Sequence, residues 1–393
     1  PVYYKKGLPY MIDEVYLPLK LPEVEKYLPT KDGDPPLGRA DEWAWDTKKN
    51  KTVSTSLINE TTIFPLELNT MPGWAGSSWY FLRYTNTSDN NPIIKNKELS
   101  YWKNVDLYIG GNEHATGHLL YSRFWTKFLF DLDFINFDEP FNKLINQGMI
   151  LGSSAIIYRD SKSKKFISKD LLKDQIVDEI HIDVSLINGS NEVDINALQS
   201  WQSQFENAEF VLANDKFKAG RKVEKMSKRW YNVVNPDLIC EQYGADSLRL
   251  FEMFLGPLEQ YKPWNTAGIS GVHNFLKKLW KLYTNDGGIR NLDSQPSKAN
   301  LKSLHTAIKK VENDIENFSF NTPVSCFMIA VNELTAQKCN SKEILEPLLI
   351  LLSPFVPHIC EEIWEMLGNS NSITFESFPI FNSTMLVEST KTY

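Results

Sequence analysis

Apolar residues recur at intervals of three and four through the last third of the chain, and this spacing restricts that region to packed helices. The two clearest sets are Ile269, Val272, Leu276, Leu279 and Tyr283, and Leu301, Leu304, Ile308, Val311 and Ile315. A third helix is predicted with Asn321 or Thr322 as its cap and Pro323 in its first turn. A fourth ends at Gly368. We therefore expect residues 264–393 to form an all-α helical bundle.

A strand, a glycine turn and a helix are predicted to follow one another earlier in the chain. Val105 to Ile109 alternates apolar and polar residues and then meets Gly110-Gly111. A helical pattern continues from Glu113 to Phe130, and Leu144 to Leu151 is a second strand candidate. This order predicts an α/β sheet with ligand chemistry at the strand ends.

Two less regular segments flank this unit. Residues 1 to about 70 are rich in proline and turn signals, which predicts an irregular connector that begins with a strand at Pro1 to Tyr4. From Ser153 to Phe217 the pattern is polar and broken, with helical character near Leu171 and Leu198. We interpret this second segment as a small insertion in the sheet domain.

The composition limits the classes of partner. A formal net charge of -7 argues against a protein that holds nucleic acid by overall basicity, so any RNA contact must be local. The segment from Lys216 to Arg229 stands out with seven Lys or Arg in fourteen residues, although such a run is also typical of a solvated face. Four cysteines lie far apart without a Cys-x-x-Cys pair, which indicates neither a zinc ribbon nor a disulfide framework.

Apolar stretches such as Leu348 to Leu352 fall far short of the ~20 residues that span a bilayer. No charged-then-apolar leader opens the sequence. These features predict a cytoplasmic protein with no membrane partner.

The first candidate site is the stretch Glu113 to His118, which would place His114 and His118 on one helical stripe. Three interpretations remain open: satisfied core histidines, a metal site, or a nucleotide site. The spacing Glu-His-x-x-x-His differs from the His-Glu-x-x-His of zinc peptidases, and no third ligand is evident. In a nucleotide site, the glycine turn would let the backbone approach the ligand, and Glu113 would accept hydrogen bonds from ribose hydroxyls.

The second candidate site is Lys225-Met226-Ser227-Lys228-Arg229. A loop with two lysines flanking a small hydroxyl residue can fold over a triphosphate and neutralise the charge that grows on departing pyrophosphate. Taken alone, the same residues also suit a basic surface turn.

Together, these features resemble the class I aminoacyl-tRNA synthetases. The stretch from Lys225 is similar to their Lys-Met-Ser-Lys-Ser signature, with Arg229 in the last position. Within that class, the chain most resembles the leucyl-tRNA synthetase family, and this resemblance covers nearly the whole chain. The segments that carry it are Met71 to Tyr84, Asp106 to Phe130, Gln147-Gly148-Met149 and Tyr243-Gly244-Ala245-Asp246.

The resemblance implies roles for individual residues. The leucine side-chain pocket would consist of Trp74, Ser77, Tyr80, Tyr108, His114 and His118. The residues near ATP and the adenylate would be Gly110, Gly111, Glu113, Gln147, Met149 and Ser227, with Glu113 on the ribose. Lys225 and Lys228 would close on the phosphates as the catalytic cations. Trp74 stands where the family commonly has Phe, and Asn69 replaces an acid.

The resemblance also implies the fold, the domains and the partners. We expect part of a Rossmann-like α/β catalytic domain followed by a helical bundle. The four parts would be 1–151, half of the catalytic domain with its connector; 152–218, a small leucyl-type insertion; 219–263, the signature loop and stem-contact region; and 264–393, the anticodon-binding domain. The parent enzyme would join leucine to tRNA(Leu) through leucyl-adenylate, with ATP as substrate, Mg²⁺ carried on it, and no protein-bound metal.

The six histidines include no His-Ile-Gly-His pair, which is the first ATP signature of the class. We therefore expect the N-terminal part of the enzyme, with that signature and the proofreading domain, to lie outside this chain. On this interpretation the chain is the C-terminal portion of the enzyme and is inactive alone.

Three alternatives remain. Isoleucyl-, valyl- and methionyl-tRNA synthetases share the loop and the bundle, but the long match at Tyr108 to Phe124 disfavours them. The chain could instead be a non-catalytic RNA-binding fragment or a subunit of a split synthetase. A metallohydrolase is the most distant alternative.

Overall fold

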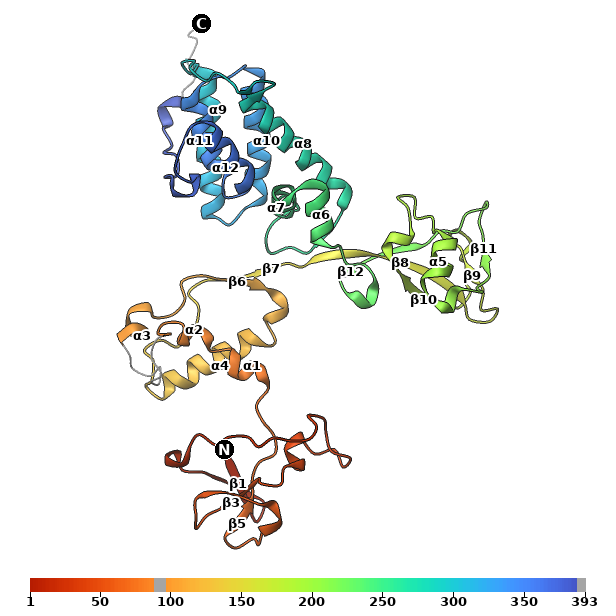
Figure 1. The fold of residues 1–393 in the computed structure, drawn as a ribbon, viewed down its shortest axis with the longest axis vertical. Helices are drawn as coiled ribbons and strands as arrows, with labels where there is room; N and C mark the ends of the chain where they lie inside the picture. Colours follow the sequence, from red (N-terminus) through yellow and green to blue (C-terminus); the bar gives the residue numbers. More distant parts are fainter. Residues whose placement is uncertain (88–96, 387–393) are drawn as a thin grey trace. The chain divides into compact units, whose positions relative to one another are not determined.

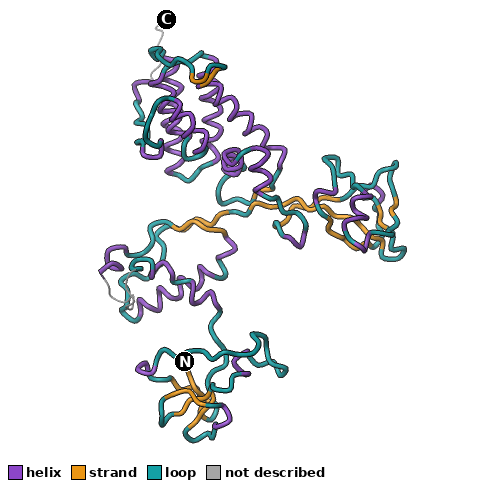
Figure 2. The backbone as a smooth tube through the Cα atoms, viewed as in Figure 1, coloured by secondary structure: helices purple, strands orange, loops and turns teal. Residues whose placement is uncertain are grey.

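The computed structural model describes residues 1–87 and 97–386. The chain forms two compact units: Pro1–Tyr108 with Glu113–Lys143, and Ile109–Asn112 with Leu144–Tyr393. Figure 1 labels the elements along the chain, and Figure 2 shows loops with short strands at its beginning and helices at its end. Within the described residues, none of the helices is both long enough and apolar enough to cross a membrane.

The first unit begins with small β-sheets. A hairpin of β1 (Val2–Lys5) and β2 (Leu8–Met11) turns at Gly7, whose φ of 76° suits glycine. An antiparallel sheet follows, made of β3 (Ala44–Asp46), β4 (Lys51–Val53) and β5 (Ile63–Pro65). Trp43, Trp45 and Leu66 are buried in a common core. The predicted strand at the start is confirmed, but the segment is more regular than the expected connector.

Helices form the rest of the first unit. They are α1 (Gly73–Ser77), α2 (Tyr80–Arg83), α3 (Lys97–Trp102) and α4 (His118–Asp131). Phe81, Leu82, Leu99 and Ile135 share a buried core. The prediction of one helix from Glu113 was wrong, because Asn112–His114 is a separate 3-10 turn and α4 begins only at His118.

A long strand organises the sheet of the second unit. This strand, β8 (Ile150–Asp160), pairs antiparallel with β10 (Val177–Ile182), β9 (Phe166–Ile167) and β12 (Gly220–Lys225), and parallel with β13 (Lys262–Pro263). The strand β11 (Phe210–Val211) pairs with β9, and α5 (Ile195–Trp201) lies between β10 and β11 in the chain. Phe166, Phe205 and Phe217 are buried in the core of this region.

The strand predicted at Leu144 to Leu151 is divided in two. The first piece is β7 (Leu144–Gln147), which pairs with β6 (Tyr108–Gly111), and β8 begins at Ile150. Between them, a Cβ on Gly148 would lie 2.1 Å from the carbonyl oxygen of Gln260. Only glycine permits this close approach of the two backbones.

Seven helices complete the described part of the second unit after β12. They are α6 (Pro236–Tyr243), α7 (Ala245–Phe254), α8 (Ile269–Tyr283), α9 (Lys298–Glu316), α10 (Asn321–Ala336), α11 (Lys342–Leu352) and α12 (Pro357–Met366). The four predicted bundle helices are present, whereas α6, α7 and α11 were not predicted. Asn321 is the first residue of α10, and the Thr322 hydroxyl donates to Asp314 Oδ2 at 2.6 Å, so neither residue caps the helix as predicted.

Candidate functional site

Three aromatic rings of the first unit gather around His118. The ring centroid of His118 lies 5.5 Å from Tyr80, 5.7 Å from Tyr108 and 6.3 Å from His114. Phe141 stacks on Tyr108 at 4.4 Å. We call Tyr80, Tyr108, His114 and His118 the aromatic cluster. Segments distant in sequence are thus joined by side-chain packing.

The start of α4 is shaped by one close packing contact. Gly117 has φ -125° and ψ -99°, outside the helical region, and a Cβ there would lie 1.8 Å from the ring of Trp74. Only glycine leaves room for that indole. The helix is then fastened to the α1 segment, because Trp125 Nε1 donates to the Ala75 carbonyl at 2.7 Å and the Ser122 hydroxyl donates to the Ser78 carbonyl at 2.8 Å.

Desolvation shifts the pKa values of two rings of the aromatic cluster, Tyr108 and His118, toward their neutral forms. Desolvation and a hydrogen bond with Tyr80 raise the pKa of Tyr108 to about 12. Desolvation, followed by repulsion from His114, lowers the pKa of His118. His118 Nε2 is buried without a hydrogen-bond partner among the described residues, and Nδ1 lies 3.3 Å from the Ser122 hydroxyl. The neutral rings of Tyr108 and His118 suit an apolar ligand better than an ionic one.

The other two residues predicted to contact leucine, Trp74 and Ser77, are exposed to solvent. Trp74 is 54% exposed, with its ring against Gly117. Ser77 is exposed, and its hydroxyl donates to the Gly73 carbonyl at 3.3 Å. Of the six predicted residues, the structure brings four rings together in the aromatic cluster. It places Trp74 beside Gly117, at the start of α4.

The predicted basic loop of the second unit connects β12 to a 3-10 turn. Lys225 ends β12, and the Ser227 hydroxyl caps the turn Lys228–Trp230 by accepting the Arg229 N–H at 3.2 Å. Lys225 and Lys228 are exposed, and neither has an ion-pair partner among the residues that the structure describes. Two cations are therefore available to an anionic ligand.

Asn232 closes the base of this loop, a role that the sequence did not reveal. Its Oδ1 accepts the Ser227 N–H at 2.9 Å, while Nδ2 donates to Ser154 Oγ at 2.9 Å and to the Lys225 carbonyl at 3.2 Å. The side chain is 2% exposed and fully bonded. An asparagine shortly after a basic loop is too common a feature to have pointed to this role.

The predicted adenylate residues divide between the units. Glu113 belongs to the first, where its carboxylate lies 4.0 Å from His114 Nε2. The others, in the second unit, are Gly110, Gly111, Gln147, Met149 and Ser227. The two glycines lie within β6, so the predicted glycine turn was wrong. The Met149 carbonyl accepts the Lys262 N–H at 3.1 Å, which holds β13 beside the start of β8.

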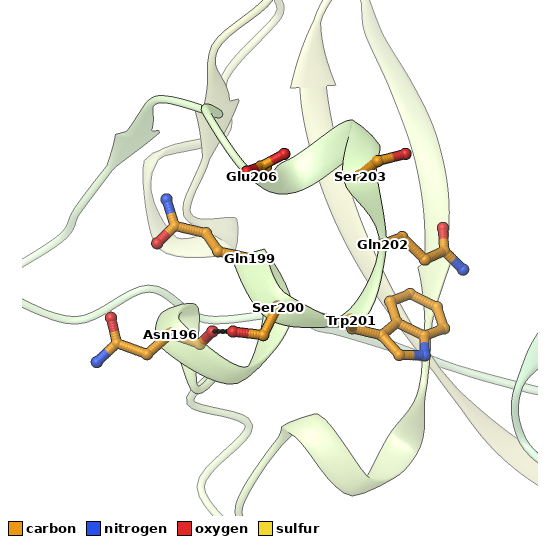
Figure 3. A pocket seen from close by; sticks show the side chains of 7 residues that line it. All are labelled: Asn196, Gln199, Ser200, Trp201, Gln202, Ser203 and Glu206. Atoms are coloured by element: carbon orange, nitrogen blue, oxygen red, sulfur yellow. Dashed lines mark hydrogen bonds between the residues drawn. The ribbon is translucent and has the colours of Figure 1, made fainter.

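Figure 3 shows a different feature, an open pocket of 460 Å³ on the insertion. It lies where α5 gives way to the 3-10 turn Ser203–Phe205, and two of its lining residues are joined by a hydrogen bond from the Ser200 hydroxyl to the Asn196 carbonyl at 2.9 Å. None of the predicted site residues lines it.

Comparisons with known proteins give the class and then the family. Residues 297–393 match the model of the anticodon-binding domain of tRNA ligase. The structure resembles a LeuRS of Agrobacterium radiobacter, solved in a ternary complex with tRNA and LeuAMS, with a TM-score of 0.65 and 26% identity over 98% of this chain and 41% of that one. The fold is accordingly that of a class I aminoacyl-tRNA synthetase.

The relatives identify the family within that class. The chain is 60% identical to the leucine–tRNA ligase of Flavobacterium johnsoniae and 57% identical to that of Christiangramia forsetii, in both cases over its whole length. It belongs to the leucyl-tRNA synthetase family. It spans 41% and 44% of the lengths of these two relatives.

Proposed function

We propose that this chain supplies the leucine-recognition and phosphate-closing parts of an enzyme that activates leucine with ATP and transfers it to tRNA(Leu). The observation that carries the proposal is the aromatic cluster, a preformed wall of packed rings in a chain that matches leucine–tRNA ligases throughout. An apolar branched side chain is the kind of group that such a wall would accept.

In this proposal, Trp74, Ser77 and the aromatic cluster contact the leucine side chain. Leucine and isoleucine differ only in branching, and an apolar pocket gains just ~1–3 kcal/mol from one methylene, so the shape of the wall must provide the selection. The lowered pKa of His118 and the raised pKa of Tyr108 favour their neutral forms at pH 7, which keeps this surface apolar.

The phosphates would be held by the loop of the second unit. The leucine carboxylate attacks the α-phosphate of ATP, and the bond to pyrophosphate breaks as charge accumulates on the leaving group. Lys225 and Lys228, both exposed, would meet that charge, with Mg²⁺ carried on ATP. Glu113 would hold the ribose, while Gly110, Gly111, Gln147, Met149 and Ser227 would lie along the adenylate.

The helical region would contact tRNA. Residues 297–393 match an anticodon-binding domain, and the Agrobacterium radiobacter relative was solved with tRNA. Because the net charge is -7, such binding would depend on local basic patches and on shape. We place the enzyme in the cytoplasm, where tRNA is charged.

Leucine-dependent exchange of pyrophosphate into ATP tests this function. We expect the 393-residue chain alone to give no exchange, since it spans about two-fifths of its relatives' length. Joined to the N-terminal part of its parent enzyme, it should exchange with leucine and far less with isoleucine. Exchange by the chain alone would contradict the first expectation, and a joined enzyme inactive with leucine would overturn the proposed function.

A further inference from the structure

Residues 257–263 lie against the junction between β7 and β8. The Gly148 N–H donates to the Leu258 carbonyl at 3.0 Å, and the Lys262 N–H donates to the Met149 carbonyl at 3.1 Å. Gly148 and Met149 are the residues between the two strands. Backbone hydrogen bonds therefore fix this segment, which we call the crossing segment, beside the junction.

The side chain of Tyr261 extends this packing to the end of β6. Its hydroxyl accepts a hydrogen bond from Asn112 Nδ2, and both residues belong to the second unit. The two residues are 149 positions apart in the sequence, and the Tyr261 ring is 52% exposed. Because a half-exposed ring gains little from burial, the hydroxyl is the part of Tyr261 that links the two segments.

Asn112 is the first residue of a very short element. The 3-10 turn Asn112–His114 directly follows β6 (Tyr108–Gly111). A single 3-10 turn has too few hydrogen bonds to hold its own geometry, so its direction depends on the contacts of its residues. The hydrogen bond to Tyr261 fixes the first of these residues to the crossing segment.

Glu113 is the middle residue of that turn. Its side chain is 46% exposed, and its carboxylate lies 4.0 Å from His114 Nε2. That distance is too long for a hydrogen bond, so the carboxylate oxygens are available to donors of a ligand. The direction of the carboxylate follows from the backbone of the turn, which Asn112 begins.

We propose that Tyr261 is a positioning residue for ATP, because its hydrogen bond to Asn112 holds the turn from which the Glu113 carboxylate meets the ribose hydroxyls. This proposal rests on the function proposed above. A carboxylate that accepts hydrogen bonds from two neighbouring hydroxyls must be well placed, since such bonds weaken steeply when their geometry is lost. The contrary view is that Tyr261 only packs beside β13 and contributes to stability.

The first experiment measures hydrogen–deuterium exchange on the 393-residue chain and needs no activity. Tyr261→Phe removes the hydroxyl and keeps the ring, so the peptide covering residues 109–116 should exchange faster by about twofold or more. The matched control is Tyr16→Phe, because the Tyr16 hydroxyl accepts the same kind of bond from Asn50 Nδ2 at 2.8 Å in the first unit. The control should leave that peptide unchanged. Unchanged exchange in Tyr261→Phe would overturn the proposal.

The second experiment measures pyrophosphate exchange in the joined enzyme. Tyr261→Phe should raise the KM for ATP about fivefold, the effect of one ordinary hydrogen bond, and change kcat and the KM for leucine less than about twofold. Asn112→Ala should act alike, and the double variant should lose about as much as either single variant, since both break the same bond. Tyr16→Phe should leave the KM for ATP unchanged. Losses that multiply in the double variant, or an unchanged KM for ATP in Tyr261→Phe, would overturn the proposal.

An ATP analogue without ribose hydroxyls separates positioning from stability. The analogue is 2′,3′-dideoxyATP, measured as a competitive inhibitor against ATP, and it offers no hydroxyl to Glu113. Its inhibition constant should therefore change less than about twofold in Tyr261→Phe. In a Glu113→Gln background, Tyr261→Phe should likewise raise the KM for ATP less than about twofold further. Parallel weakening of ATP and the analogue would show that Tyr261 supports the site as a whole, and would overturn the proposal.

These experiments separate the positioning role from the proposed function. If the unmodified joined enzyme fails to activate leucine, the proposed function fails, and the role of Tyr261 toward ATP fails with it. If leucine is activated but Tyr261→Phe leaves the KM for ATP unchanged, only the positioning role fails.

Discussion

The aromatic cluster of the first unit and the basic loop of the second are built in opposite ways. In the cluster, the side chains proposed to contact leucine are themselves packed, with ring centroids 5.5–6.3 Å from that of His118. In the loop, Lys225 and Lys228 are exposed, and the contacts belong to their neighbours Asn232, Trp230 and Tyr231.

This difference matches two physical tasks. Selecting an apolar side chain needs a rigid, dehydrated wall, so packing and recognition can use the same atoms. Neutralising charge on a phosphate needs a cation that stays hydrated until the ligand arrives, so its position has to come from the backbone. Substitutions in the cluster should therefore change the preference of the enzyme among amino acids. Substitutions in the loop should change the rate of leucine activation.

The largest expected effect is at Lys228. In the joined enzyme, Lys228→Ala should lower kcat for leucine activation by roughly 100-fold or more, because a lost preorganised contact costs about 3 kcal/mol. The KM for leucine should stay nearly constant. Steady-state pyrophosphate exchange measures both values, with Lys173→Ala, an exposed lysine of the insertion, as control. A loss below about threefold would remove the loop from the mechanism.

Lys225→Ala should act in the same direction. If the loop closes as a unit, the double variant with Lys228→Ala should lose much less than the product of the two single losses. A loss of kcat in the double variant equal to the product of the two single losses would show that the two lysines act independently.

A smaller effect, and a different one, is expected at Tyr80. Tyr80→Ala removes a wall of the cluster and should raise the KM for leucine about tenfold while narrowing the preference over valine and norvaline. Activation kinetics with the three amino acids measure this. His118→Ala should behave alike.

The matched control is His305→Ala, a histidine on α9 that should leave activation untouched. If the site histidines are only core residues, the cluster variants should lose stability and all activities in parallel. A lowered melting temperature with an unchanged preference would therefore refute the pocket assignment.

The smallest effect concerns pH. Burial, with repulsion from His114, holds the pKa of His118 below its usual value of 6.5, so the unfolded chain binds this proton more readily. Its contribution to stability is present above about pH 6.5 and is lost as the pH falls toward the folded pKa. When the pH is lowered from about 8 to about 5.5, the melting temperature of the His118→Gln variant should therefore fall by less than that of the unmodified chain. Equal losses would show that His118 is not buried in solution.

The regular helices were predictable because their pattern is local. Apolar residues at three and four over 301–315 correspond to α9 (Lys298–Glu316). By contrast, α11 was missed because it has six buried residues in eleven and Pro347 inside it. A helix surrounded by other helices has no wide polar face and so gives little periodic signal.

The candidate sites were predictable only in part. Resemblance named the residues of the cluster, but the start of α4 depends on Trp74 packing against Gly117, a tertiary contact that no local pattern reveals. The ring of Trp230 packs against His181 and that of Tyr231 against Trp201, and both partners are distant in sequence. Pairings of this kind follow from the folded structure alone.

The ratio of leucine to norvaline activation, measured as relative kcat/KM in the joined enzyme carrying either Lys228→Ala or Tyr80→Ala, tests the central claim most directly. We expect Lys228→Ala to keep the ratio of the unmodified enzyme despite its large loss of rate. Tyr80→Ala should lower the ratio several-fold. A ratio changed by Lys228→Ala, or preserved in Tyr80→Ala, would contradict the division of selection and rate between the aromatic cluster and the basic loop.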